Sequence, residues 1–599
     1  MTSPPADHGL DGVEIFHDLD PAERAKLAAE LDTLSLQRGE VLVRQGEMTD
    51  ALYIVVTGRF AITLEGRRDM LAEVGPGQPI GEIAFLAGGV RTATVTALRD
   101  SVVLRLGRSA FEALSEKSPR IWRTLAVTLA GRLAEANVST APPPDPRPRT
   151  IALIRAGASV MPEGFVASLV DVFASKHRTV LLRAETATAV LPPHTPLASA
   201  EATRALNALE GTHDYVLYLA DGELTPWSEK AIRQADLVLA IGQHSADPTL
   251  NALERLTRTL LPGDAQRLVL LHPTRAAITG TARWLADRTI AMHHHVALDE
   301  PGDTERLYRF INGTALGLIA CGGGAYCAAH IGLYKALTQA GLSFDIVGGT
   351  SGGGAITAAF AMGTSPDAVD QAIHEIFVTN KAMRRYTWPR YSLLDHTHFD
   401  QQLANHYAGI DIEDLWVPYF AVSANLSSHS LHQHRRGDLW AAVRSTGSIP
   451  VLLPPYYEDG HMLVDGAIMD NVPVRVMHEL KSGPNVVVSF DVAKLERFEV
   501  DYRALPGRNH LLKWLMTPYL RGALPPAPGM GTVLLRSIMA NRQGFEQHLR
   551  PDDLLLVPPL PPDMGILDWH RHTELADATY RWGLTEMARL KSEGHAIIR

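Results

Sequence analysis

A run of glycines interrupted by one serine, GGTSGGG, lies between an apolar segment and an Ala-rich segment. Within it, Gly349, Thr350, Ser351, Gly352 and Gly353 fit the GxSxG pattern, in which the chain turns sharply from a strand into a helix and exposes the serine hydroxyl. The N-terminus of the following helix can also stabilise negative charge. The pattern predicts that Ser351 is a nucleophile, although a glycine-rich turn with an incidental serine has the same letters.

A serine nucleophile needs donors for the oxyanion of its tetrahedral intermediate, and a second glycine-rich loop is a candidate for this role. The segment LGLIACGGGAYCAAHIGLYKAL runs from an apolar strand through Gly322, Gly323 and Gly324 into a helix. Three consecutive glycines leave backbone N–H groups accessible. Dinucleotide-binding loops look similar, but Cys327 stands where the last glycine of GxGxxG is required.

The serine also needs a base, and Asp465 is the candidate. In HMLVDGAIMDNVPV, Asp465 ends an apolar run and is followed by Gly466 and Ala467. Asp-Gly on its own is a common turn. The glycine triplet, the GxSxG serine and the Asp-Gly-Ala sequence, however, follow one another at comparable strand ends, and together they predict an acyl hydrolase with a serine nucleophile.

Histidine and metal chemistry are the alternatives. A Ser-His-Asp triad would take its base from one of the histidines that follow Asp465, none of which lies in a glycine-flanked loop: His478, His510, His548, His570, His572 and His595. The HHH run at 293–295 has no acidic or cysteine partner at ligand spacing, and HExxH is absent. We therefore favour serine and aspartate, keep the triad as the alternative, and expect no metal in the chemistry.

Composition bounds the class of protein. The chain has 599 residues, of which 46% are hydrophobic and 20% charged, as in a globular protein of several domains. Its 56 basic and 66 acidic residues give a net charge of −10, which excludes a global attraction to nucleic acid. Two cysteines indicate a reducing compartment, and the segment MTSPPADHGL carries no secretory signal. We expect a cytoplasmic protein with no nucleic-acid partner.

Periodicity and proline content divide the chain into five segments. Residues 1–136 contain short β-type runs with helical patterns at both ends, which predict a β-barrel or jelly-roll with flanking helices. Residues 137–149 are a Pro-rich linker. Residues 150–312 alternate strand and helix patterns without the Gly-Lys-Ser/Thr of a phosphate loop, and predict an α/β scaffold. Residues 313–500 are expected to form the catalytic α/β domain, and 501–599 its C-terminal helical extension.

Two segments bear on membrane contact. No Lys, Arg, Asp or Glu occurs between Arg309 and Lys335, but the glycine triplet at the centre of this stretch argues against a transmembrane helix. Residues 509–524, NHLLKWLMTPYLRGAL, combine aromatic, aliphatic and basic side chains, which fits a membrane interface or a core helix or lid. A peripheral contact with membranes therefore stays open.

Taken together, the three motifs resemble those of the patatin-like phospholipases, which carry a glycine-rich oxyanion loop, a GxSxG serine and an Asp-Gly-Ala/Gly motif in this order. The resemblance implies an α/β hydrolase with a Ser351-Asp465 dyad, with Gly322, Gly323 and Gly324 lining the oxyanion hole. TGTARWLADR, IEDLWVPYFAVSANLSS and GDLWAAVRSTGSIPVLLPP are similar to the neuropathy target esterase group. That resemblance implies hydrolysis of phospholipid or lysophospholipid esters without a catalytic cofactor.

The loop departs from the family at two positions. The family usually continues with Arg or Lys and then Gly, where this chain has Tyr326 and Cys327. Backbone donors would survive both changes, whereas the missing cation bears on headgroup preference. A catalytically impaired binding or scaffold protein on the same fold is therefore the alternative function.

A further motif lies in the first segment. IGEIAFLAGGVRTATV joins Gly81 and Glu82 to Arg91 and Thr92, and it resembles the phosphate-binding cassette of cyclic-nucleotide-binding domains. A guanidinium suits an anionic phosphate, and a carboxylate can accept from a ribose hydroxyl. By this resemblance Arg91 binds the phosphate and Glu82 the 2′-OH of a regulatory cAMP or cGMP. Retention of the fold without a ligand is the alternative.

Overall fold

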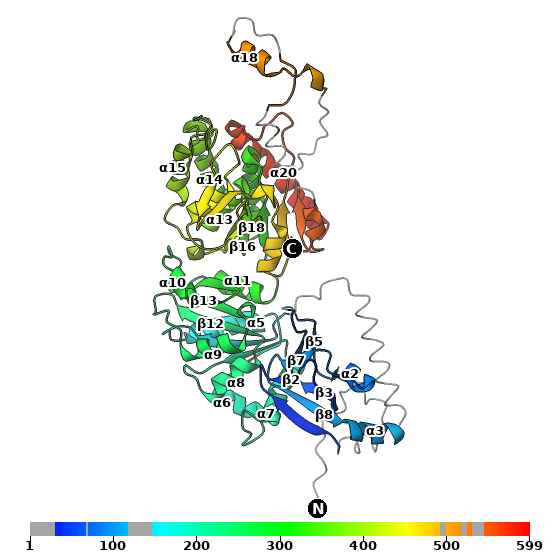
Figure 1. Cartoon of the computed structure of the whole chain (residues 1–599). Coiled ribbons are helices and arrows are strands. Elements are labelled where there is room, and N and C mark those ends of the chain that lie inside the picture. The colour runs from blue at the N-terminus through cyan, green and yellow to red at the C-terminus, as the bar shows by residue number, and fades with distance from the viewer. Residues whose placement is uncertain are drawn as a thin grey trace, which may run out of the picture. The chain divides into compact units, whose positions relative to one another are not determined.

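The computed structural model describes residues 30–67, 70–117, 147–490, 499–516, 524–529, 533 and 544–598, and Figure 1 labels its elements. The chain forms two compact units, the first comprising residues 1–275 and 283–312 and the second residues 276–282 and 313–599. The helical patterns predicted before residue 30 and over 118–136, and residues 137–146 of the predicted linker, lie outside the described residues.

Two four-stranded antiparallel sheets, β1-β8-β3-β6 and β2-β7-β4-β5, form a jelly-roll in the first unit (Figure 1). The elements are β1 (Asp32–Leu36), β2 (Val41–Val43), β3 (Ala51–Thr57), β4 (Phe60–Thr63), β5 (Ala72–Val74), β6 (Pro79–Ile80), α2 (Glu82–Ala87), β7 (Thr94–Ala97), β8 (Ser101–Gly107) and α3 (Arg108–Lys117). Along β3, Leu52 and Ile54 face one apolar cluster and Tyr53 and Val55 another, because successive side chains of a strand point to opposite faces. The predicted jelly-roll is confirmed.

A six-stranded parallel sheet, in the order β10-β11-β9-β12-β13-β14, forms the rest of the first unit. Its strands are β9 (Thr150–Arg155), β10 (Thr179–Leu182), β11 (Tyr215–Leu219), β12 (Leu237–Gln243), β13 (Gln266–His272) and β14 (Met292–Ala297). The helices are α5 (Glu163–Ala174), α6 (Ala184–Val190), α7 (Ala200–Thr212), α8 (Pro226–Gln234), α9 (Ala252–Leu260), η3 (Gly263–Ala265), α10 (Ala282–Leu285) and α11 (Pro301–Ile311). Both faces of β9 are buried, Ile151 and Leu153 on one side and Ala152 and Ile154 on the other, as expected for a parallel strand between two helix layers.

The loop after β9 lies where a nucleotide-binding α/β domain would hold phosphate, at the point where the strand order reverses between β9 and β12. There the Gly157 N–H donates to the Glu254 carboxylate at 2.8 Å. A Cβ at Gly157 would lie 2.3 Å from the carbonyl oxygen of Asp247 and 3.0 Å from the Trp284 ring. Because a carboxylate and an indole of this chain fill the position, the arrangement fits the scaffold role inferred from the sequence.

Buried charges join the jelly-roll to the α/β sheet within the first unit. Asp100, just before β8, accepts hydrogen bonds from Lys230 Nζ at 2.7 Å and Arg233 Nε at 3.2 Å, and Arg99 pairs with Glu210. All five side chains are buried. Burial lowers the pKa of Lys230, and the Asp100 carboxylate opposes this effect. Since a buried charge without its partner is costly, each of the two parts depends on the other at this interface.

An eight-stranded sheet in the order β19-β20-β17-β16-β15-β21-β22, with β18 paired to β17, is the centre of the second unit. The strands are β15 (Gly317–Ala320), β16 (Ile346–Thr350), β17 (Tyr419–Asn425), β18 (Ser430–His434), β19 (Tyr456–Glu458), β20 (His461–Asp465), β21 (Asn485–Val488) and β22 (Leu554–Leu556). Five neighbouring strands pair in parallel: β22, β21, β15, β16 and β17. The other pairs are antiparallel, with β18 and β20 next to β17 and β19 next to β20. Predicted as a separate α/β domain, this layer is confirmed.

Helices cover both faces of this sheet. The helices described in this unit, not all of which contact the sheet, are η4 (Gly324–Ala328), α12 (Ala329–Gln339), α13 (Gly352–Ala361), α14 (Pro366–Ile373), η5 (His374–Thr379), α15 (His396–Tyr407), η6 (Ile412–Asp414), α16 (Leu439–Thr446), η7 (Gly466–Ile468), α17 (Val474–Leu480), η8 (Tyr502–Ala504), α18 (Arg508–Met516), η10 (Phe545–His548), η11 (Trp569–Arg571) and α20 (His572–Ser592). At Gly332 of α12, a Cβ would lie 1.9 Å from the Ala576 carbonyl oxygen of α20, so the two helices are in backbone contact. Within residues 501–599, predicted as a helical extension, α20 thus packs on α12, and Leu554–Leu556 supply β22.

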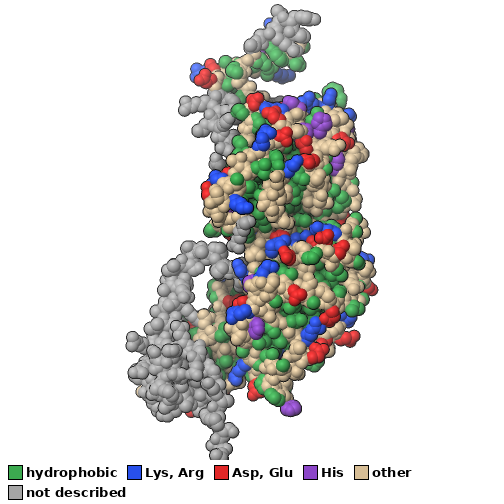
Figure 2. All heavy atoms as spheres, turned by 180° about the vertical axis from the view of Figure 1, so that it is seen from behind, with side chains coloured by type: hydrophobic (Ala, Val, Ile, Leu, Met, Phe, Trp, Pro, Cys, Tyr) green, Lys and Arg blue, Asp and Glu red, His purple; other side chains and the backbone are tan. Residues whose placement is uncertain are grey.

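Charged side chains of both signs lie on the face of the molecule that Figure 2 presents. Figure 2 shows acidic and basic side chains interspersed on the face it presents, in keeping with the net charge of −10. The uncharged stretch before Lys335 forms β15, the glycine turn and the start of α12. Within the described ranges, no helix combines the length and apolar character needed to cross a membrane.

Candidate active site

Parallel strands bring the two glycine-rich loops together. β15 and β16 are hydrogen-bonded neighbours, so the loops that follow them leave the sheet at the same edge. The first contains the glycine triplet and the second contains Ser351. Asp465 ends β20, which pairs with β17 next to β16. The topology thus collects the three motifs at one edge, although Ser351 and Asp465 are 114 residues apart in sequence.

Ser351 lies in a strained turn between β16 and α13. Its φ is 54° and its ψ −130°, a backbone conformation that side chains other than glycine rarely adopt. The flanking glycines allow the close packing that holds it: a Cβ at Gly349 would lie 2.3 Å, and at Gly353 2.5 Å, from the Ala320 carbonyl oxygen. The predicted strand, sharp turn and helix are present, and the strain is of the kind that positions a nucleophile.

The serine and the aspartate are in direct contact. Ser351 Oγ donates a hydrogen bond to Asp465 Oδ2 at 2.6 Å, and Asp465 Oδ1 accepts from the Ala467 N–H at 2.9 Å. Both side chains are buried. A Cβ at Gly466 would lie 2.3 Å from the Val422 carbonyl oxygen, so only glycine fits after the aspartate. The pair has the geometry of a nucleophile hydrogen-bonded to its base.

Two threonines hold the turn in place. The Ser351 N–H donates to Thr446 Oγ1 at 2.9 Å, and Thr446 Oγ1 donates to the carbonyl oxygen of Val422 on β17. Thr350 Oγ1 donates to the Asp470 carbonyl oxygen at 2.9 Å, which ties the elbow to the loop after Asp465. Thr446 is a supporting residue that the sequence analysis missed, because nothing in GDLWAAVRSTGS distinguishes it before the fold brings α16 behind the serine.

Unpaired backbone donors surround the serine. In the described part of the chain, the N–H groups of Gly323, Gly324 and Gly352 have no hydrogen-bond acceptor. Gly324 has φ +57°, and a Cβ there would lie 2.3 Å from the Ile566 carbonyl oxygen. Gly322 packs behind the nucleophile, where a Cβ would lie 2.9 Å from Ser351 Cβ. Free donors beside a nucleophile are what an oxyanion requires, and Gly352, expected only as an elbow residue, adds one.

A largely apolar cavity of about 420 Å³ opens beside Ser351. Its apolar wall includes Ile356, Met362, Val369, Ile373, Ile376, Phe377, Phe399, Leu403, Leu453 and Trp569. Gln371, Glu375, Asn405 and His406 are polar exceptions. These residues come from segments far apart in sequence, so no local sequence pattern marks them as one binding surface.

The predicted nucleotide-binding residues of the jelly-roll also come together. Arg91 is 3% exposed and donates to the carbonyl oxygens of Gly81 at 3.2 Å and Ala51 at 2.7 Å. Gly81 has φ +77°, and a Cβ there would lie 1.9 Å from Arg91 Nη1. Glu82 is buried at the start of α2, and Thr92 is exposed. Among the described residues, Arg91 forms no ion pair, so its buried charge lacks a counter-ion.

Family models match each of these regions. The model described as "Patatin-like phospholipase" matches residues 318–478, which contain the dyad and both glycine loops. The chain contains a patatin-like phospholipase domain. Residues 33–118 match a cyclic nucleotide-binding domain, and residues 148–319 match the P-loop-like domain of the neuropathy target esterase family. Each of the three resemblances inferred from the sequence is thus confirmed by a matching family model.

Proteins that match most of the chain share 30% or less of its sequence in the following three cases. Patatin-like phospholipase domain-containing protein 7 of Mus musculus is 28% identical over 78% of this chain and 39% of its own length. Neuropathy target esterase sws of Drosophila mojavensis is 30% identical over 74% and 33%, and Lysophospholipase nte1 of Aspergillus terreus is 26% identical over 95% and 42%. The chain therefore spans less than half of these proteins. Among solved structures, the Thermus thermophilus catabolite activator protein is 33% identical over 21% of this chain and 60% of its own, with a TM-score of 0.20.

The patatin-like domain accommodates the two departures in its oxyanion loop. Tyr326 Oη donates to the carbonyl oxygen of Met564 at 2.5 Å, and Cys327 is buried with its Sγ 3.6 Å from the Cys321 carbonyl oxygen. A Cβ at Gly352 would lie 2.9 Å from that Sγ. Tyr326 therefore anchors the loop to the C-terminal segment, and Cys327 acts as a small core residue.

Histidines lie away from the dyad of the patatin-like domain. His478 bonds to Asp553 at 3.0 Å and His572 to Asp370 at 2.6 Å. Among the described residues, no imidazole is hydrogen-bonded to Ser351 or Asp465. The HHH run at 293–295 lies in β14, where His295 bonds to His272 at 2.9 Å. The geometry therefore favours the dyad over a Ser-His-Asp triad.

Asp465 has the ionisation expected of a base near neutral pH. Burial raises its pKa to about 6, while the hydrogen bonds from Ser351 and from the Ala467 N–H oppose the rise. A base must be ionised to take the serine proton. We therefore predict that kcat/KM for a water-soluble short-chain aryl ester falls as pH drops through about 6.

The control for this pH profile is Asp470→Asn. Burial also raises the pKa of Asp470. Within the described residues, however, its carboxylate accepts a hydrogen bond only from the Val472 N–H and has no contact with the serine hydroxyl. The midpoint of the acid limb should therefore stay near pH 6 in this variant. A wild-type profile that is flat down to pH 4.5 would contradict the assignment.

The same ionisation acts on stability: because the folded pKa is raised, the charged carboxylate destabilises the fold above pH 6. Asp465→Asn should thus abolish activity yet raise the free energy of unfolding at pH 8, by at most about 3 kcal/mol.

Proposed function

We propose that the patatin-like domain hydrolyses the carboxylic ester of a lysophospholipid or phospholipid. The hydrogen bond from Ser351 Oγ to Asp465 Oδ2 is the observation that carries the proposal. In the first step Ser351 Oγ attacks the acyl carbonyl carbon as its proton passes to Asp465. The carbonyl oxygen becomes an oxyanion, and the unpaired N–H groups of Gly323, Gly324 and Gly352 lie where they can stabilise it.

The second half of the cycle releases the products. The tetrahedral intermediate collapses, the ester C–O bond breaks, and the protonated Asp465 returns its proton to the leaving alcohol. The acyl chain is then bound to Ser351 Oγ as an ester. Asp465 takes a proton from a water molecule, which attacks the acyl carbon, and the fatty acid leaves with Ser351 protonated again. No step needs a metal or an organic cofactor.

The cavity supports a lipid with a single acyl chain in the site. Its volume of about 420 Å³ lies within the range of pockets for one small ligand, and its walls are mostly aliphatic and aromatic. The name of the fungal relative, Lysophospholipase nte1, points to the same class of substrate. The alternative, a binding or scaffold protein without activity, accounts less well for a strained serine already bonded to a buried carboxylate.

Fatty-acid release from lysophosphatidylcholine tests the proposal. The wild type should release fatty acid, and Ser351→Ala should lower kcat/KM by at least about a thousandfold because the nucleophile is lost. Ser592→Ala, an exposed serine of α20, is the matched control and should keep the wild-type rate. A wild type with no ester hydrolysis on any lysophospholipid, or an active Ser351→Ala variant, would contradict the proposed function and favour the scaffold.

We also propose that the domain meets its substrate at a membrane surface, on the cytoplasmic side. The loop RRYTWPRY, residues 384–391, exposes Tyr386, Trp388 and Tyr391 by 80%, 87% and 75%, and its arginines are exposed beside them. Met383, which precedes the loop, lines the cavity. Aromatic rings favour the headgroup region and arginines favour anionic lipid.

Both cysteines are free and buried, which supports a reducing compartment. In the segment predicted for this role, α18 has several exposed apolar side chains, and residues 517–523 lie outside the described part of the chain.

The membrane proposal predicts a change in rate that depends on the surface. The ratio of lysophosphatidylcholine hydrolysis in phosphatidylglycerol vesicles to hydrolysis of a water-soluble ester should fall at least about threefold in Trp388→Ala, because the variant lacks an aromatic ring that favours the headgroup region. Tyr502→Ala, 84% exposed but outside the loop, should leave the ratio unchanged. Equal ratios in the wild type and Trp388→Ala would count against this loop.

We propose, third, that the jelly-roll binds cAMP or cGMP through Arg91 and Glu82. The support is a buried guanidinium that bonds to two carbonyl oxygens and has no carboxylate partner in the described residues. Buried charges are ordinarily paired, so an anionic phosphate is the natural partner. The bonds from Arg91 to Gly81 and Ala51 would hold the side chain in position before the nucleotide arrives.

Calorimetric titration of the full-length chain with cAMP and cGMP tests nucleotide binding. Arg91→Ala should weaken binding at least tenfold, since loss of a buried phosphate partner costs about 2 to 5 kcal/mol. Arg105→Ala, whose partners Asp32 and Asp50 are exposed, should bind like the wild type. If the wild type shows neither heat nor a shift in melting temperature at millimolar nucleotide, the jelly-roll has a structural role.

A further inference from the structure

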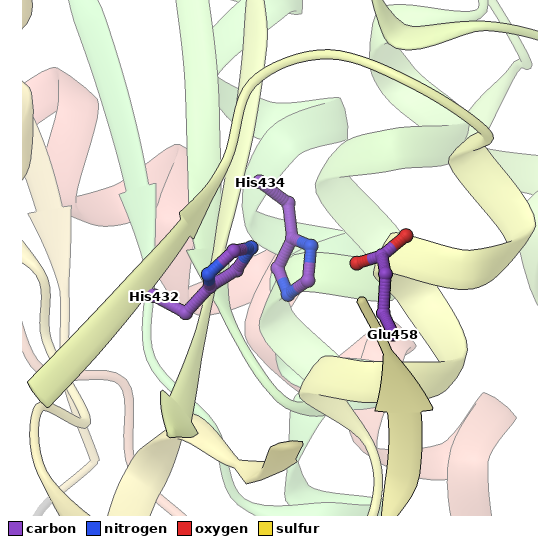
Figure 3. Close-up of side chains that lie close together, drawn as sticks. All are labelled: His432, His434 and Glu458. Carbon is purple, nitrogen blue, oxygen red and sulfur yellow. The ribbon is translucent and has the colours of Figure 1, made fainter. Parts of the chain in front are cut away.

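A cluster of three metal-ligating side chains lies on the sheet of the patatin-like domain, outside the cavity. His432 and His434 are on β18, and Glu458 ends β19. One possible ligand atom from each residue lies within 4.8 Å of the other two. Figure 3 shows the Glu458 carboxylate directed at the His434 ring, with His432 on the other side of that ring. The two histidines, two positions apart on one strand, share a face of the sheet.

His434 is held as a metal-ligating histidine is usually held. It is 6% exposed, and its Nε2 is hydrogen-bonded to Ser423 Oγ at 2.8 Å. Its Nδ1 has no hydrogen-bond partner among the described residues. Ser423 Oγ in turn bonds to Ser445 Oγ at 3.0 Å. A hydrogen bond from the outer ring nitrogen to a second residue fixes the tautomer and leaves the inner nitrogen free for a metal.

The structure assigns a divalent-metal site, with Zn²⁺ as the fitting ion, to His432, His434 and Glu458. Two imidazoles and a carboxylate form a donor set typical of zinc, which takes three protein ligands and a water in an open position. Hard cations such as Mg²⁺ prefer oxygen ligands and fit this set poorly.

Pairing registers suggest what such an ion would do. Ser423 of β17 pairs with His432 of β18 on one side and with Asp465 of β20 on the other, and β20 pairs with β19. An ion bound to β18 and β19 would therefore connect the two outer strands of a four-stranded antiparallel segment. Ser445, which bonds to Ser423, precedes Thr446, the residue that accepts from the Ser351 N–H. The ion would stabilise the part of the fold that holds Asp465, without taking part in ester hydrolysis.

Zinc titration of the chelator-treated full-length chain tests the site. We expect the wild type to bind one equivalent of Zn²⁺ that His432→Gln and Glu458→Gln bind at least about tenfold more weakly, since even supporting residues of such sites contribute that much. His461→Gln is the matched control, because His461 is an exposed neighbour that is not part of the cluster. Both cluster residues are less buried than His434, and within the described residues neither side chain forms a hydrogen bond, so we expect both variants to fold.

Melting temperature supplies the second measurement. Zn²⁺ should raise the melting temperature of the wild type and His461→Gln, but not of His432→Gln or Glu458→Gln, and Mg²⁺ should have no effect on any of them. The site is overturned if the wild type binds zinc no more tightly than His432→Gln. It is also overturned if the equivalent survives in both cluster variants, which would place it at other histidines such as those of β14. Neither result depends on whether the ester is hydrolysed.

Discussion

The hydrogen bond between Ser351 and Asp465 joins two side chains that are almost wholly buried. The rest of the patatin-like domain must hold these two groups together out of water. A carboxylate out of water must find its hydrogen bonds in the protein, and within the described residues the Asp465 carboxylate accepts only from the serine and one backbone N–H. Its pKa rises in consequence, which is useful for a base and unfavourable for folding. Strands β16, β17 and β20, the Thr446 contact and the glycines that admit close packing all serve to keep the two groups in place despite this cost.

Local sequence singled out the candidate catalytic residues because the chemistry proposed for them requires particular residue types at short spacing. Only glycine fits beside the strained serine and after Asp465, so the motifs are visible as letters. The jelly-roll and the parallel sheets followed from period-two and strand-helix alternation, which the buried faces of β3 and β9 explain. What carries no local constraint was missed: Thr446 is one hydroxyl in an ordinary helix, and β22 is three leucines that pair with β21 only in the finished sheet.

The middle domain has the strand order of a phosphate-binding α/β domain but lacks the residues that would bind phosphate. The loop after β9 still presents the Gly157 N–H at the point where the strand order reverses, but the acceptor is Glu254 and the space is closed by Trp284. A carboxylate in the place of a phosphate satisfies the same donor and removes the need for a ligand. This accounts for a resemblance to P-loop domains without the Gly-Lys-Ser/Thr that phosphate and magnesium would need.

The shared charges around Asp100 bear on how such proteins can evolve. Cyclic-nucleotide-binding domains are commonly treated as modules that genes gain and lose intact, yet here Lys230 of the α/β sheet has its carboxylate partner in the jelly-roll. A deletion of the jelly-roll alone would leave the Lys230 ammonium, the Arg233 guanidinium and the Glu210 carboxylate without their jelly-roll partners, so it would be tolerated only together with changes at these three residues. Because these charged groups are buried and paired across the two parts, we expect the jelly-roll and the α/β sheet to be stable only together, whether or not the jelly-roll binds a nucleotide.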